Sequence, residues 1–102
     1  MSLDALDPVI HAPKRLAAMA MLASSSSATF AFLRDHLGVS DSDLSKQMSA
    51  LERAGYVKRE KTGHGRGGAT WYKITRDGTA AYRRHLEALR AIVGEEPPPA
   101  DG

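Results

Sequence analysis

The sequence predicts a single α+β domain that is mainly helical, with three helices, a two-stranded hairpin and a long last helix. Three observations predict this fold. Apolar residues recur at helical spacing up to residue 54, aromatic and β-branched residues fill two short runs between residues 56 and 74, and helical spacing returns up to residue 93. The chain has 102 residues, of which 42% are apolar and 25% charged. These values fit one soluble domain and exclude a disordered polymer or a membrane-embedded chain.

The first helix is expected from Pro13 to about Ala23. Proline suits the first turn of a helix, because the N–H that it lacks would have no intrahelical partner there. Apolar side chains surround the second half of this segment, which predicts that the helix lies in the core. The four serines from residue 24 to residue 27 are expected to form the loop that follows it.

The next two helices are expected to begin at capping residues. Thr29 can cap the first of them, and Gly38 ends it. Ser40 can cap the second, which is expected from about Asp41 to Ala54. The apolar residues that share one face are Phe30, Leu33 and Leu37 in the first helix and Leu44, Met48 and Leu51 in the second. Both helices should therefore pack one face on the core.

A change of pattern then predicts a hairpin followed by a last helix. Residues 56–61 and 70–74 have the composition of strands, and a glycine-rich loop joins them. Thr75 can cap a helix from about Asp77 to Val93. The apolar stripe of this helix consists of Tyr82, Leu86, Leu89 and Val93. The acidic, proline-rich residues 95–102 are expected to form an extended tail.

Positive charge is concentrated in the body of the chain. The net charge is only +2, but residues 8–94 hold all 14 Lys and Arg and only seven of the 12 acids, which makes this part +7. A basic body favours a polyanionic partner such as nucleic acid. The chain has no cysteine, which excludes disulfides, thiolate nucleophiles and cysteine zinc sites.

Three stretches of the sequence resemble a known DNA-binding family. Leu-Ser-Lys-Gln-Met at residues 44–48 and Leu-Glu-Arg-Ala-Gly-Tyr-Val at residues 51–57 are similar to the end of a recognition helix and the turn into a wing strand. Thr-Trp-Tyr-Lys-Ile-Thr-Arg-Asp-Gly at residues 70–78 is similar to the returning strand and the next helix start. Residues 6–93 therefore resemble a winged helix-turn-helix domain of the MarR-like bacterial transcription regulators.

The resemblance implies a three-helix core, a two-stranded β wing and a C-terminal dimerisation helix. The expected parts are an N-terminal segment at residues 1–12, a DNA-binding domain at 13–75, a dimerisation helix at 76–94 and a tail at 95–102. The last helix would join two copies through Tyr82, Leu86, Leu89, Ile92 and Val93. The N-terminal segment is a candidate second contact in this homodimer.

The expected DNA contacts lie on the third helix and on the hairpin. If the apolar face of the third helix points into the core, small polar and basic side chains lie on the other side. This recognition set consists of Ser42, Ser45, Lys46, Gln47 and Ser49. Hydroxyl and amide groups can bond to base edges in the major groove of double-stranded DNA. The wing set, with charge for phosphates or a narrow minor groove, consists of Lys58, Lys61, His64 and Arg66.

Other classes of function find less support in the sequence. The glycine-rich loop joins two strands and lacks Gly-Lys-Ser or Gly-Lys-Thr, so it does not predict a phosphate loop. The four histidines lack metal-ligand spacing, and no catalytic set recurs, so no cofactor and no enzymatic activity are expected. The alternative to DNA binding is a winged helix used only for protein interaction. A cytoplasmic location is expected, because neither a signal peptide nor a membrane-spanning run is present.

Overall fold

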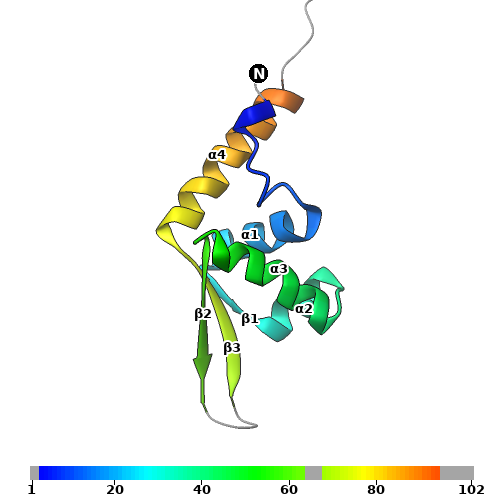
Figure 1. The fold of residues 1–102 in the computed structure, drawn as a ribbon, viewed down its shortest axis with the longest axis vertical. Coiled ribbons are helices and arrows are strands. Elements are labelled where there is room, and N and C mark those ends of the chain that lie inside the picture. Colours follow the sequence, from blue (N-terminus) through cyan, green and yellow to red (C-terminus); the bar gives the residue numbers. More distant parts are fainter. Residues whose placement is uncertain (1–2, 64–67, 95–102) are drawn as a thin grey trace, which may run out of the picture.

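The computed structural model describes residues 3–63 and 68–94. In chain order the elements are η1, a 3-10 helix (Leu3–Ala5), α1 (Pro13–Ser25), β1 (Ser27–Thr29), α2 (Phe30–Leu37), α3 (Asp41–Arg53), β2 (Val57–Thr62), β3 (Ala69–Ile74) and α4 (Arg76–Val93). Figure 1 shows the β2–β3 hairpin projecting from one end of the helical body and α4 extending from the other. The fold is therefore mainly helical with one small sheet, as predicted.

The helix boundaries follow the capping signals in the sequence. The hydroxyl of Thr29 accepts a hydrogen bond from the N–H of Phe32, and that of Ser40 accepts one from the N–H of Asp43, each at 3.1 Å. The hydroxyl of Thr75 accepts a hydrogen bond from the N–H of Gly78, in the first turn of α4, at 2.9 Å. The predicted bounds of the helices and of the hairpin strands differ from the observed ones by at most two residues.

The sheet has a third strand that the sequence analysis did not predict. The strand order is β1-β3-β2, and both neighbouring pairs are antiparallel. The expectation of a serine loop from 24 to 27 was wrong, because the first two serines complete α1 and Ser27 begins β1. Only Ser26 turns the chain, with φ of 71°. A strand of three residues is too short for alternation to show, and pairing with β3 holds it in place.

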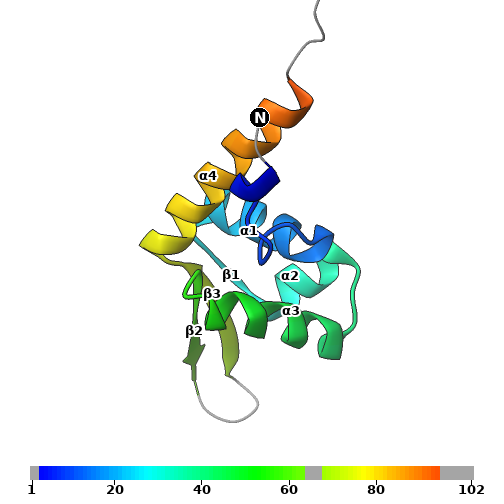
Figure 2. The ribbon, with the colours of Figure 1, turned by 45° about the horizontal axis from the view of Figure 1, so that its top comes forward.

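The core lies where α1, α2 and α3 meet the sheet. The fully buried large apolar side chains are Ile10, Met19, Leu22, Leu33, Leu44, Met48 and Leu51. The three that α3 contributes are those that the sequence predicted. Figure 2 shows the N-terminal segment running beside α4 and over α1. Its last large apolar residue, Ile10, thereby closes the core from this side.

The face of α4 that packs on the body consists of small residues and one histidine. Its buried residues are Gly78, Ala81, His85 and Ala88. The predicted apolar stripe lies beside this face, with Tyr82, Leu86 and Leu89 half-buried. Val93 at the end of the stripe is 79% exposed. The body of one chain therefore covers the stripe only in part.

Candidate nucleic-acid interface

The exposed face of α3 is polar and basic. Because Leu44, Met48 and Leu51 are buried, the residues on the other side of the helix point outward. After the first residue of the helix, Asp41, which is paired with Arg34, the exposed side chains of α3 are Ser42, Ser45, Lys46, Ser49 and Arg53. Four of them belong to the predicted recognition set. Arg53 was missed, although it follows Ser49 by four residues and Lys46 by seven, which is the spacing of one helix face.

Gln47, the fifth member of the predicted set, lies toward α1. Its Oε1 accepts a hydrogen bond from Nη1 of Arg15 at 2.8 Å, and its Nε2 donates to Oδ1 of Asp43 at 2.9 Å. Nε of Arg15 also donates to the carbonyl oxygen of Val9 at 2.5 Å. Both the oxygen and the nitrogen of the Gln47 amide are thus hydrogen-bonded within the protein. Through Arg15 these bonds fix α3 against α1 and the N-terminal segment.

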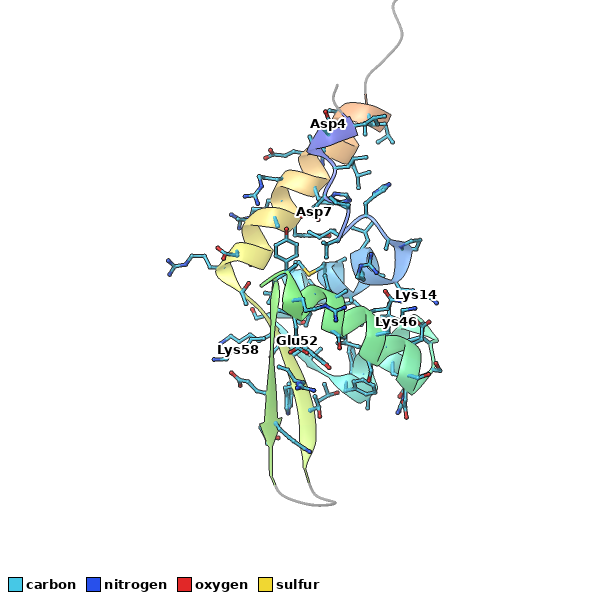
Figure 3. All side chains as sticks on the ribbon, viewed as in Figure 1. Asp4, Asp7, Lys14, Lys46, Glu52 and Lys58 are labelled. Carbon is cyan, nitrogen blue, oxygen red and sulfur yellow. The ribbon has the colours of Figure 1, made fainter. Side chains whose placement is uncertain are left out.

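An ion pair joins the same two helices at the start of α3. Nζ of Lys14 donates to Oδ2 of Asp43. The pKa of Asp43 is lowered, because hydrogen bonds from Lys14 and then Gln47 stabilise the charged carboxylate. Lys46 adds a favourable charge near this carboxylate. Figure 3 shows Lys14 and Lys46 beside the half of α3 that lies away from the hairpin.

The turn between α2 and α3 is held by an exposed arginine. Arg34 donates from Nη1 to Oδ1 of Asp41 at 2.9 Å and from Nε to Oδ1 of Asp35 at 3.0 Å. The pKa of Arg34 is raised, first by the bond to Asp41 and then by that to Asp35. Surface ion pairs of this kind contribute little to the free energy of unfolding. Their role here is to set the geometry of the turn. Arg34 ties the last half of α2 to the first residue of α3.

The hairpin presents its cations on two different faces. Arg59 lies opposite the buried Tyr72 and Lys61 lies opposite Thr70, so both occupy the sheet face that looks toward α3. The guanidinium of Arg59 lies 3.8 Å from Oε1 of Glu52 on α3. Lys58 occupies the other face, and Figure 3 shows it pointing away from α3. Of the predicted wing residues, Lys61 thus lies on the sheet face toward α3. Arg59 lies on the same face, and the sequence analysis did not include it in the wing set.

The two other predicted wing residues, His64 and Arg66, lie outside the described residues. The outer face of the sheet carries Trp71, which lines two shallow hollows with residues of β1. Phe32, from the first turn of α2, is 47% exposed and borders one of them. These aromatic side chains therefore lie on the face of the sheet that looks away from α3.

Two kinds of feature do not occur in the part of the chain that the structure describes. Within residues 3–63 and 68–94, no three His, Asp or Glu side chains gather in a way that could hold a metal ion. No helix among the same residues is long and apolar enough to cross a membrane.

The geometry agrees with comparisons to known proteins. The family model described as a winged helix DNA-binding domain matches residues 14–93. A transcriptional regulator homologue from Pyrococcus horikoshii OT3 has a similar structure, with a TM-score of 0.79 and 29% sequence identity over 84% of this chain and 85% of its own. A comparison with curated proteins found no match.

More distant structures share the fold. A MarR mutant from E. coli, solved in complex with operator DNA, has a TM-score of 0.68 and 18% identity over 81% of this chain and 58% of its own. YusO from Bacillus subtilis has a TM-score of 0.76 and 18% identity, over 90% and 64%. The chain thus spans less than two thirds of these two proteins. Since the family model covers most of the sequence, the chain belongs to the family of winged helix DNA-binding domains.

Proposed function

We propose that the protein is a transcriptional regulator that binds specific double-stranded DNA sequences as a homodimer. In this proposal α3 enters the major groove, and the β2–β3 hairpin contacts the backbone or the minor groove. The observation that carries it is the exposed face of α3, which combines three small hydroxyl side chains with Lys46 and Arg53. A module used only for protein interaction would be expected to present apolar or acidic residues on this face.

The roles of the side chains follow from their size and charge. Ser42, Ser45 and Ser49 allow a close approach to the groove floor and can donate or accept at base edges. Lys46 and Arg53 can reach a guanine or a phosphate. On the hairpin, Arg59 and Lys61 extend the same basic surface, and His64 and Arg66 remain predicted contacts. The proposal assigns no base to Gln47, because Arg15 and Asp43 already use its amide.

The homodimer is supported by the stripe that the body of one chain leaves partly uncovered. Tyr82, Leu86, Leu89 and Ile92 are half-buried, and Val93 is exposed. Burial of such a stripe contributes about 25 cal/mol for each Å² of apolar surface. A two-fold dimer would present two α3 helices to successive major grooves about 34 Å apart. We therefore expect a binding site with an inverted repeat.

The proposal is tested by selecting duplexes from a random pool and measuring affinity against salt concentration. Lys46→Ala and Arg53→Ala should weaken binding, and each should lower the salt slope by roughly two units per dimer if its cation contacts one phosphate. Lys73→Ala is the matched control, because Lys73 lies on the sheet face that looks away from α3. Failure to bind any duplex at low salt, or equal effects of Lys46→Ala and Lys73→Ala, would contradict the proposal.

A further inference from the structure

A polar cluster around a buried histidine lies where the N-terminal segment meets α4. His85 is 0% exposed, and among the described residues it is the one polar or charged residue in the buried class. It projects from the face of α4 that packs on the body of the domain. The groups bonded to it are Asp7 and His11, both from the N-terminal segment. None of these three residues has a role in the proposed DNA contact.

The hydrogen bond from the backbone determines which ring nitrogen carries the hydrogen when His85 is neutral. The backbone N–H of Asp7 donates to Nδ1 of His85 at 3.0 Å, so this nitrogen carries no hydrogen. The hydrogen of neutral His85 is therefore on Nε2, which lies 3.3 Å from Nδ1 of His11. His11 must accept at Nδ1 and carry its own hydrogen on Nε2. No ring nitrogen of His85 can take another proton without losing a hydrogen bond.

The Asp7 side chain connects this pair to the turn that ends α3. Its Oδ2 accepts a hydrogen bond from the hydroxyl of Tyr56 at 2.5 Å, and its Oδ1 accepts from the N–H groups of Val9 and Ile10 at 2.8 and 3.2 Å. The carbonyl oxygen of Tyr56 in turn accepts from the N–H of Thr75, just before α4, at 3.0 Å. Asp7 therefore holds the N-terminal segment against both α4 and the end of the proposed recognition helix.

The charges around His85 favour its neutral form. Burial lowers the pKa of His85 below 6.5, the nearby His11 lowers it further, and Asp7 opposes them. The pKa of Asp7 lies below 3.8, because burial, which raises it, is outweighed by the bonds from Tyr56, Ile10 and Val9 and by His85. Asp77 and Arg84 of α4 act on Tyr56. From α1, which also packs on α4, the buried side chains are apolar, namely Ala18, Met19 and Leu22.

The sign of the pH effect follows from these directions. His85 in a released segment would have an ordinary pKa near 6.5 and would bind a proton more readily than buried His85 does. The docked arrangement is therefore fully stable above pH 6.5 and loses stability as the pH falls from there through the lower pKa of His85. Asp7 acts in the same direction but only below pH 3.8. The effect near neutral pH thus belongs to His85.

We propose that Asp7, His11 and His85 form an acid-sensitive latch that holds the N-terminal segment on α4, and that its release weakens DNA binding. The inference rests on the proposed function. The segment lies along the helix that carries the proposed dimer stripe, and Asp7 bonds to the turn after α3. Release of the segment loosens the packing that sets α3 relative to α4.

General electrostatics predicts the opposite response to acid, which makes the inference testable. Histidines that gain charge near a polyanion strengthen DNA binding as the pH falls. The latch instead weakens it, by at most about tenfold per protomer for each pKa unit that separates docked from released His85, a limit reached when the released form dominates. A fall in affinity between pH 7.5 and 5.5 at constant ionic strength therefore distinguishes the two.

The experiment measures fluorescence anisotropy with a duplex selected at pH 7.5, and backbone amide exchange of Asp7 and Val9 over the same pH range. In the wild type, affinity and amide protection should fall together. His85→Asn keeps an acceptor near Nδ1 but cannot titrate, so its affinity should not fall. His11→Gln, at an exposed position, tests the same pair if His85→Asn does not fold. The matched control is His36→Gln on α2, whose affinity for the duplex should fall with pH as that of the wild type does.

Different outcomes overturn the two proposals. If the wild type binds the duplex at pH 7.5 and then binds more tightly at pH 5.5, the latch is refuted and the proposed function stands. If Asp7 keeps its protection after correction for intrinsic exchange, the latch is also refuted. If the protein binds no duplex at any pH, the proposed function fails, and control of DNA binding by the latch fails with it.

Discussion

The helices α3 and α4 are alike in packing against the rest of the domain, but the faces that they leave uncovered differ in kind. Each helix buries one face on the body of the domain. Apart from Asp41, which pairs with Arg34, the uncovered side chains of α3 are serines and cations, which water already solvates. On α4 the buried face is flanked by apolar residues that end at Val93, with 79% of its surface exposed. A hydrated basic face suits a polyanion, whereas an apolar stripe is stabilised by a second protein surface.

The largest effect is expected at the centre of the α4 stripe, where Leu89 lies. Leu89→Glu is expected to abolish the proposed dimer at micromolar concentration, because its two-fold interface would bury two unpaired carboxylates at several kcal/mol each. The dissociation constant should rise by about a thousandfold or more, which corresponds to roughly 4 kcal/mol. Sedimentation velocity checks this outcome.

The matched control for this change lies on the same helix. Ala91 is exposed and two residues further along, which places it on roughly the opposite side of α4. Ala91→Glu adds the same charge and should leave the dimer intact. A wild-type protein that sediments as a monomer at micromolar concentration would contradict the apolar stripe as an interface.

The second largest effect is expected where α4 crosses the turn after α3. A Cβ added to Gly78 would lie 2.1 Å from the carbonyl oxygen of Tyr56, which is backbone and cannot rotate away. Gly78→Ala should therefore destabilise the domain by about 3 kcal/mol, despite the better helix propensity of alanine. The midpoint of urea unfolding measures the loss.

Gly38 provides the control for glycine replacement. It has a φ of +65°, and no heavy atom lies within 4 Å of an added Cβ. Gly38→Ala should therefore cost only about 1 kcal/mol, the strain of a left-handed backbone. If Gly78→Ala were as stable as the wild type, α4 would not approach the turn as closely as the structure has it.

The sequence predicted what short-range signals determine. Capping hydroxyls at Thr29, Ser40 and Thr75 act within three residues, and the bonds that they make are those expected. The buried face of α3 follows from the helical period, so its exposed face could be predicted as well. Arg53 was missed only because the period was not followed to the last helical residue.

Contacts between distant residues could not be predicted in this way. β1 is a strand because Ala28 pairs with Tyr72, a partner far along the chain. The histidines looked scattered, yet the fold places His11 and His85, 74 residues apart, in contact. The sequence predicted that Gln47 contacts a base, but Arg15 of α1 donates a hydrogen bond to its side chain. In each case the partner is set by tertiary packing, which leaves no local pattern.

The smallest expected effect separates Gln47 from its neighbour Ser45 at the edge of the exposed face of α3. Ser45→Ala should leave stability within about 0.5 kcal/mol and change the preferred base at one position of each half-site. Gln47→Ala removes the bonds to Arg15 and Asp43, so it should cost about 1 kcal/mol in stability and weaken all duplexes by similar factors. Urea unfolding and binding to a library of single-base variants measure both. A changed base preference of Gln47→Ala at unchanged stability would contradict this expectation. It would mean that the wild-type amide leaves Arg15 of α1 when DNA binds and contacts a base, as the sequence pattern alone predicted.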